Sequence, residues 1–170
     1  MLKELNPEKL SIDVFNLWAN KWFLLTSGEY INGNYNSMTV AWGGFGVMWN
    51  KLVANVVVRP TRFTFEFTEK YDSFTLCSFP EKYKGALVLL GTKSGKDGNK
   101  LSQAGLTVVK SRVVDSPSFE EADLIVECKK IYFDDIKPEN FLDQTINSNY
   151  PKKDYHRYYI GEIVKVLSLD

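Results

Sequence analysis

The feature that most constrains the fold of this chain is the stretch from Asn36 to Lys70. It contains two apolar segments separated by a polar turn at residues 49–51, and the second segment is a β-branched run over residues 53–58. Two apolar runs joined by a tight turn are typical of an antiparallel hairpin. The sequence therefore predicts two neighbouring strands here, followed by a break at Arg59-Pro60-Thr61-Arg62.

The segment after this hairpin has the chemistry of an anion site. Two arginines and two threonines surround a proline where the strand gives way to a segment with helical spacing. N–H groups at a helix N-terminus point outward, the helix dipole favours negative charge, and arginine adds bidentate contacts to a phosphate. We expect a helix over residues 62–70 with Thr61 or Thr64 as its N-cap. Ordinary surface arginines are the alternative interpretation.

Strand patterns dominate the rest of the chain. Apolar or β-branched runs predict strands over residues 21–26, 74–79, 106–114, 124–133 and 155–167. Helical spacing predicts short helices over residues 11–20 and 82–90, the second of which we expect to end at Gly91. Many strands with a few short helices predict a mainly β fold, a closed or half-closed antiparallel barrel. No repeat or linker interrupts the chain, so residues 1–170 are expected to form one domain.

Charge and hydropathy narrow the range of partners. The 21 Lys and Arg residues balance the 21 Asp and Glu residues, which gives no broad electrostatic footprint for nucleic acid and no reason to invoke an anionic membrane. No apolar window approaches the length of a membrane span or of a signal peptide. We therefore expect a soluble cytoplasmic protein without nucleic-acid or membrane partners.

Several known motifs are missing from the sequence. Cys77 and Cys128 are not part of a C-x-x-C pair, so buried free thiols are expected and no metal site is predicted. The stretch from Lys93 to Asp97 lacks the spacing of a Walker motif, and taken alone it is a solvated lysine loop. No G-x-G-x-x-G follows a strand, which excludes a standard dinucleotide-binding domain.

Several short motifs in consistent order nevertheless carry a family resemblance. They are N-x-M-T-x-x-W-G-G at 36–44, R-P-x-R-x-T at 59–64, S-G-K-D at 94–97 and D-Y-H-R at 154–157. Together they cover most of the chain and resemble the flavin reductase-like proteins of the FMN-binding split barrel, including the flavoredoxins. The resemblance implies a single flavin reductase-like FMN-binding domain over residues 1–170. It also implies a homodimer, with the flavin in a groove near the subunit interface.

The resemblance implies two groups of cofactor contacts. The phosphate of FMN is expected near the arginine turn and the lysine loop, at Arg59, Pro60, Thr61, Arg62, Thr64, Ser94 and Lys96. The isoalloxazine ring, whose pyrimidine side needs donors and acceptors, is expected at Asn36, Ser37, Met38, Thr39 and Trp42. Core packing is the alternative role for Met38, and a core or interface position is the alternative for Trp42. Lys96 stands where arginine is common in the family, so the charge is retained but the bidentate fork is lost.

The implied activity is that of an FMN-dependent oxidoreductase of the flavin reductase or flavoredoxin type. Electrons would pass from NAD(P)H, as a transient donor, or from a protein donor through FMN to a flavin or protein acceptor. FMN is preferred over FAD. His156, the only histidine, is a weak catalytic candidate near the ring, and a structural role is its alternative. A non-catalytic flavin carrier or sensor, and a barrel that has lost its flavin, are the competing hypotheses.

Overall fold

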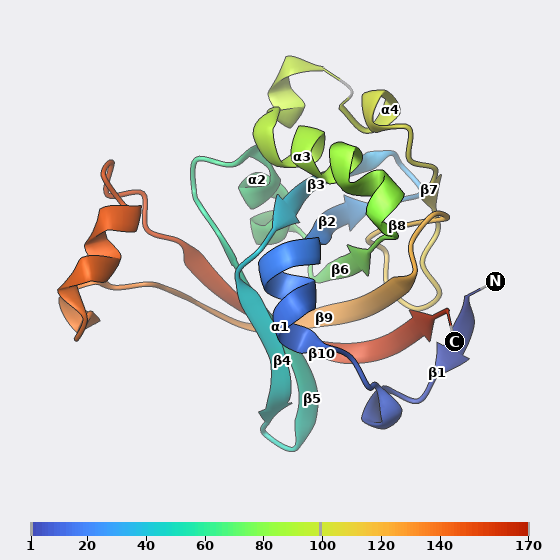
Figure 1. The fold of residues 1–170 in the computed structure, drawn as a ribbon, viewed down its shortest axis with the longest axis horizontal. Coiled ribbons are helices and arrows are strands. Elements are labelled where there is room, and N and C mark those ends of the chain that lie inside the picture. Colours follow the sequence, from blue (N-terminus) through green and yellow to red (C-terminus); the bar gives the residue numbers. More distant parts are fainter. Residues whose placement is uncertain (1, 99, 170) are drawn as a thin grey trace.

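A curved antiparallel sheet organises the computed structural model, which describes residues 2–98 and 100–169 (Figure 1). Within those residues the sheet has eight strands, in the order β3-β2-β6-β9-β10-β5-β4, with β1 paired to β10. Its strands are β1 (Lys3–Leu5), β2 (Phe23–Glu29), β3 (Asn34–Val40), β4 (Gly43–Met48), β5 (Lys51–Val58), β6 (Ser73–Ser78), β9 (Leu124–Asp135) and β10 (Arg157–Ser168). A smaller sheet pairs β7 (Val108–Val109) with β8 (Ser118–Phe119).

The barrel is split because its two edge strands do not pair. Strands β3 and β4 are neighbours along the chain but stand at opposite ends of the strand order. Only Ala41 and Trp42 separate them, and neither residue is in a strand. The predicted mainly β fold with a half-closed barrel is confirmed, and the opening between β3 and β4 lies beside Trp42.

The predicted hairpin is right for its second half only. Strands β4 and β5 pair with Met48 opposite Lys51, and the turn residues Trp49 and Asn50 have φ of 53° and 57°. Positive φ at both central residues is the geometry of a type I′ turn, which matches the twist of a hairpin. Residues 34–40 form the separate strand β3, which pairs with β2 instead. The expected single strand was wrong because Trp42 breaks it into two.

The helices agree with the sequence in position but not in their ends. The helix after the hairpin, α2 (Phe63–Lys70), has Arg62 at its N-cap without a side-chain capping bond, so the expected caps Thr61 and Thr64 were wrong. Helix α3 (Lys84–Thr92) continues through Gly91 rather than ending there. A Cβ at Gly91 would lie 3.2 Å from Cβ of Thr39, so this glycine permits close packing of α3 on β3.

The remaining helical elements are short. They are α1 (Val14–Asn16), the π-helix η2 (Leu17–Lys21), α4 (Lys100–Ala104) and the 3₁₀ helices η1 (Pro7–Lys9), η3 (Glu81–Tyr83), η4 (Gly95–Asp97), η5 (Pro138–Asn140) and η6 (Gln144–Asn149). No helix in the described part of the chain is long and apolar enough to cross a membrane.

The strand expected over residues 106–114 is largely absent. Only Val108 and Val109 are in a strand, and residues 112–116 form bends. The cause lies in the buried carboxylate of Glu127, which accepts hydrogen bonds from the backbone N–H groups of residues 112, 113 and 114 at 2.7, 2.7 and 3.2 Å. These three N–H groups satisfy the hydrogen-bonding capacity of the carboxylate. They are therefore not available for hydrogen bonds to a neighbouring strand.

Two apolar clusters form the core, and both cysteines belong to it. One cluster fills the barrel around Leu25, Val56 and Tyr159, and the other lies between the sheet and α3. Cys77 and Cys128 are buried free thiols, as predicted, and burial raises the pKa of the Cys77 thiol to about 12. Neither thiol is therefore reactive in this environment.

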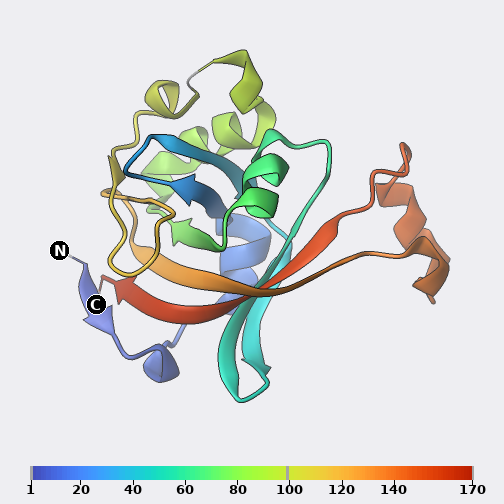
Figure 2. The same ribbon diagram turned by 180° about the vertical axis from the view of Figure 1, so that it is seen from behind.

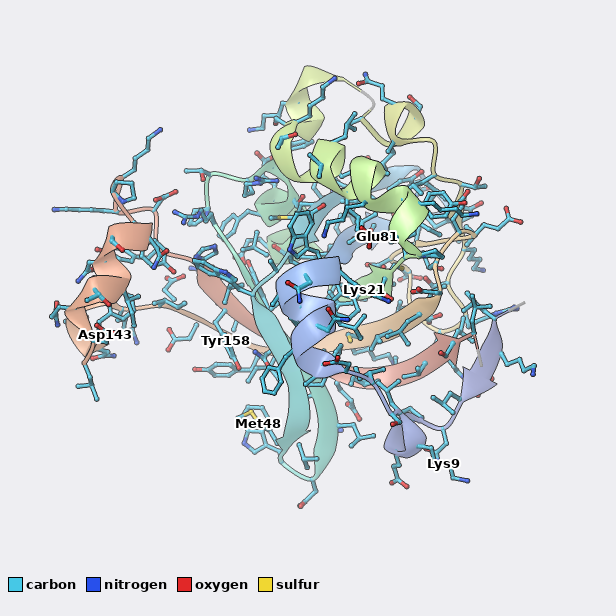
Figure 3. The ribbon with its side chains drawn as sticks, in the orientation of Figure 1. Lys9, Lys21, Met48, Glu81, Asp143 and Tyr158 are labelled. Carbon is cyan, nitrogen blue, oxygen red and sulfur yellow. The ribbon has the colours of Figure 1, made fainter. Side chains whose placement is uncertain are left out.

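One segment leaves the compact body. Residues 136–156, which we call the strap, connect β9 to β10 and project sideways from the sheet in both views (Figures 1 and 2). Asp143 lies toward its far end (Figure 3). The strap returns to the body at His156, whose carbonyl accepts a 2.9 Å hydrogen bond from the N–H of Ile136.

Candidate functional site

Two hollows contain most of the predicted cofactor residues. The first, which we call the strand-edge hollow, has a volume of about 190 Å³ and is lined by residues 38–42, Val57, Arg59 and His156. The second, which we call the cation hollow, has a volume of about 150 Å³ and is lined by residues 61–64, residues 92–95 and Lys100. Thr39 and Gly91 connect them, since Thr39 packs on Gly91 and the Gly91 carbonyl accepts a bond from Arg62.

The strand-edge hollow lies at the opening of the split barrel. Trp42 stands at this opening and is 47% exposed, and its ring centroid lies 5.1 Å from that of His156. Met38 is buried, so only part of it reaches the hollow. Thr39 donates from its hydroxyl to the carbonyl of Leu87 in α3, which fixes β3 against that helix. An exposed indole beside a mostly apolar wall provides a surface on which a flat ring can pack.

His156 is a neutral group in this wall. Its side chain is buried, and its Nδ1 lies 2.8 Å from the hydroxyl of Tyr150. Burial lowers the pKa of His156 to about 4, and the nearby charge of Arg59 adds to the effect, while Asp154 opposes it. The imidazole is therefore uncharged at neutral pH. It can donate or accept a hydrogen bond there, but it does not carry a proton for general acid catalysis.

Arg59 is held by the strap. Its Nη1 lies 2.8 Å from Oδ1 of Asp154, its Nη2 donates a 2.8 Å hydrogen bond to the carbonyl of Asn149, and its guanidinium lies 4.9 Å from the ring centroid of Tyr150. All three partners belong to the strap. Arg59 lines the strand-edge hollow and is not part of the cation hollow, where the phosphate contacts were expected.

The cation hollow takes its charge from Arg62 and Lys100. Nη2 of Arg62 donates to the Gly91 carbonyl at 2.8 Å, and Nζ of Lys100 donates to the carbonyls of Leu90 and Lys93 at 3.1 and 3.2 Å. These acceptors lie at the end of α3, where the helix dipole attracts cations. Neither side chain is ion-paired with a carboxylate among the side chains that the structure describes.

Burial makes this positive charge costly. Desolvation, together with a smaller contribution from the neighbouring Arg62, lowers the pKa of Lys100 to about 8. Desolvation also lowers the pKa of Arg62, with a contribution from Arg59. Two adjacent cations that lack a counter-charge among the described side chains would be stabilised by an anion that enters the hollow.

The other predicted phosphate residues divide into two groups. Thr64 and Ser94 line the cation hollow, where Ser94 accepts a 3.2 Å bond from the N–H of Lys96. Lys96 points away, because its ammonium pairs with Glu66 at 2.7 Å on the surface. Pro60 and Thr61 form an exposed turn, and Thr61 borders the hollow.

Two predicted ring residues lie outside the strand-edge hollow. The Asn36 amide donates to the Thr64 hydroxyl at 2.7 Å, and Ser37 is fully buried, with its hydroxyl 2.7 Å from that of Thr26. Asn36 borders a further hollow of about 250 Å³ that shares Lys100 with the cation hollow. The structure therefore places Met38, Thr39 and Trp42 together, and gives Asn36 and Ser37 a position inside the fold.

The sequence analysis missed Lys100, Tyr150 and Asp154 as individual site residues. Lys100 ends a loop rich in glycine and lysine, and only its neighbour Leu101, which is buried in the core, marks the point where the loop turns inward. The motif that contains Asp154 is visible in the sequence, but no neighbouring residue indicates a contact with Arg59, which is far away in sequence. That relation depends on the course of the strap.

Comparisons with known proteins agree with this geometry at the level of the fold. No protein-family model matches the chain. An uncharacterized protein from Pyrococcus abyssi is 28% identical over 113 residues, which is 66% of this chain and 63% of that protein. The matched region thus spans less than two thirds of the relative's length.

Solved structures give a clearer likeness. An FMN-binding domain of a flavin reductase-like enzyme from Shewanella baltica superposes with a TM-score of 0.69 at 20% identity, covering 99% of this chain and 77% of that one. Flavoredoxin of Desulfovibrio vulgaris gives a TM-score of 0.68 at 20% identity, with coverage of 98% and 77%. The chain therefore has the split-barrel fold found in flavin reductase-like FMN-binding proteins.

Proposed function

We propose that this chain is a flavin-dependent oxidoreductase that binds FMN, with its phosphate in the cation hollow and its ring at the strand-edge hollow. The observation that carries the proposal is the pairing of the buried Lys100 with the half-buried Arg62, which lack a carboxylate partner among the described side chains. A phosphate dianion supplies the missing charge and accepts charge-assisted hydrogen bonds. The hydroxyls of Thr64 and Ser94 line the same hollow as further donors.

The strand-edge hollow fits the flat part of the same cofactor. Trp42 and Met38 provide apolar surface for a ring, and the backbone of β3 ends there as an unpaired sheet edge. Unpaired N–H and C=O groups at such an edge can meet the donors and acceptors of a pyrimidine ring. FMN, when bound, supplies the electron-transfer chemistry. The residues of this chain bind the cofactor and orient it.

We propose NAD(P)H or a protein as the electron donor, and a flavin or a protein as the acceptor. The exposed position of Trp42 at the opening of the barrel supports this, because a second molecule can reach a ring packed there. Two buried free thiols fit the reducing conditions of a cytoplasmic location, which belongs to the same proposal.

We also propose that the protein is a homodimer. Val47, which is 67% exposed, and Trp49, which is 57% exposed, form the tip of the β4–β5 hairpin. Trp49 packs against the half-exposed Tyr132 of β9, with 6.0 Å between ring centroids. Contiguous exposed apolar side chains of this kind mark protein interfaces. Light scattering tests the proposal, and Val47→Glu, which puts like charges on both sides of a twofold contact, is expected to give a monomer.

The experiment that tests the cofactor compares FMN with riboflavin, which lacks the phosphate. We expect FMN to bind more tightly, and Arg62→Met and Lys100→Met to weaken FMN at least tenfold while riboflavin binding changes little. Lys129→Met, a surface change on β9, is the matched control. Equal binding of both flavins by the wild-type chain, or no binding of either, contradicts the phosphate assignment.

The second part of this experiment separates an enzyme from a carrier. Loss of the visible flavin absorption after anaerobic addition of NADH or NADPH supports the reductase and identifies its donor. Bound flavin that stays oxidised supports the alternative, a flavin carrier or sensor, or a shuttle that needs a protein donor. Titration with FAD in parallel tests the preference for FMN.

A further inference from the structure

Contacts with the strap, and not with the cation hollow, set the position of Arg59. Three different groups of the strap hold the guanidinium, namely a carboxylate, a backbone carbonyl and an aromatic ring. A side chain fixed on three sides cannot also swing toward the cation hollow without breaking these contacts. Arg59 therefore presents its charge to the strand-edge hollow, which it lines together with Trp42 and His156.

Among the described residues that line the strand-edge hollow, Arg59 is the cation. His156 is the other titratable group of that lining, and it is neutral at neutral pH. Asp154, which pairs with Arg59, is not among the residues that line the hollow. A ring packed in the hollow thus meets the positive member of this ion pair in the wall, and the counter-ion lies outside the lining.

We propose that Arg59 is a ring-side cation of the flavin site rather than a phosphate ligand, and that the strap holds it there through Asp154. The inference rests on the proposed function. A reduced flavin carries more negative charge than an oxidised one, so a fixed cation beside the ring stabilises the reduced form. Arg59 is then the residue that sets the balance between the two forms, and Asp154 and Tyr150 are positioning residues.

The experiment measures the dissociation constants of oxidised and reduced FMN and of oxidised and reduced riboflavin for the wild-type chain and for Arg59→Met. We expect the variant to lose affinity for the reduced form about tenfold more than for the oxidised form, which lowers the two-electron midpoint potential of the bound flavin by about 30 mV. FMN and riboflavin should show the same change, because the phosphate is not involved. Arg112→Met, which changes an exposed arginine that lines neither hollow, is the control.

A loss of affinity for FMN alone would overturn the proposal. If Arg59→Met weakens FMN but not riboflavin, with no change in the ratio of reduced to oxidised affinities, Arg59 is a phosphate ligand. Arg59→Gln, which keeps a donor for the Asn149 carbonyl, repeats the test should the methionine variant fold poorly. A wild-type chain that binds neither flavin overturns the proposed function and this inference together.

A double-mutant cycle tests the role of the strap. Asp154→Asn is measured in the wild-type chain and again in Arg59→Met. We expect it to shift the ratio of reduced to oxidised affinities in the first background and to shift it less than about twofold in the second, because Asp154 acts through Arg59. An equal shift in both backgrounds, or no shift in either, contradicts the positioning role.

Discussion

The side-chain amide of Asn36 donates a 2.7 Å hydrogen bond to the hydroxyl of Thr64, and both groups are buried. This bond joins β3 to the first turn of α2, at the edge of the cation hollow that Thr64 lines. The sequence motifs had placed the two residues in different parts of a cofactor site. In the structure they bind each other, and this contact helps to hold the first turn of α2 against β3.

Thr64→Val is therefore expected to destabilise the fold. Valine keeps the shape of threonine but leaves the buried Nδ2 of Asn36 without its acceptor, which costs about 1–3 kcal/mol. The free energy of unfolding, measured by urea denaturation, tests this. Thr61→Val is the matched control, because Thr61 is exposed. Equal stability of the two variants would show that the bond contributes nothing.

The parts of the fold that follow from local chemistry were predicted from the sequence. The turn at Trp49 and Asn50 specifies the β4–β5 hairpin, and the β-branched run before Val58 specifies its second strand. The breaks that were missed depend on distant residues. Residues 112–115 are β-branched or charged, yet they bend because the buried carboxylate of Glu127 binds the N–H groups of residues 112–114.

The residues of the candidate site also divide into those that local sequence predicts and those whose position depends on distant contacts. Arg62 could be proposed as part of an anion site from the sequence, because a strand end and a helix start are visible there, and the structure places it in the lining of the cation hollow. Lys100 could not, because its burial results from the packing of α4 under the end of α3, and a lysine in a glycine-rich loop is usually solvated. The direction of Arg59 depends on the strap, which contacts it from about 90 residues further along the chain.

The two glycines of α3 should respond to alanine in opposite ways. Gly85 has nothing within 4 Å of an added Cβ, so Gly85→Ala is expected to raise the stability by about 0.5 kcal/mol through helix propensity. At Gly91 the added Cβ would lie 3.2 Å from Cβ of Thr39, so Gly91→Ala should lose this gain and destabilise the packing of α3 on β3. Thermal unfolding of both variants tests the difference, and a gain at both sites contradicts it.

The affinity for FMN should fall at alkaline pH. In the proposed site Lys100 would bind the phosphate in its protonated form, and its pKa in the free protein lies at about 8. Binding of FMN therefore requires proton uptake above that value, and the affinity should be about tenfold weaker at pH 9 than at pH 7. Lys100→Arg, which stays charged, should remove this dependence, and riboflavin should not show it. An FMN affinity that does not change over this range would contradict the assignment of Lys100.

The same lysine predicts how stability depends on pH in the absence of ligand. Its pKa is about 8 in the folded chain, against 10.5 as the ordinary value, so the unfolded state binds more protons between these values. The contribution of Lys100 to the free energy of unfolding therefore rises with pH across this window. Denaturation of the wild-type chain and of Lys100→Met from pH 7 to 10 tests this, since the variant should lack that rise. Parallel pH profiles would contradict the burial of a charged ammonium.

Replacing one carboxylate oxygen of Glu127 by an amide NH₂ group, as in Glu127→Gln, is expected to lower the free energy of unfolding more than the other single substitutions described above. Its carboxylate is fully buried and accepts three backbone N–H groups from residues 112–114. In Glu127→Gln an amide NH₂ faces some of these donors, so charge-assisted bonds are lost and a repulsive contact is added, at a cost of about 2–4 kcal/mol. Urea denaturation measures the loss, with the exposed Glu120→Gln as control. Hydrogen exchange at residues 112–114 should accelerate in the variant, whereas unchanged protection would show that the loop is held by other contacts.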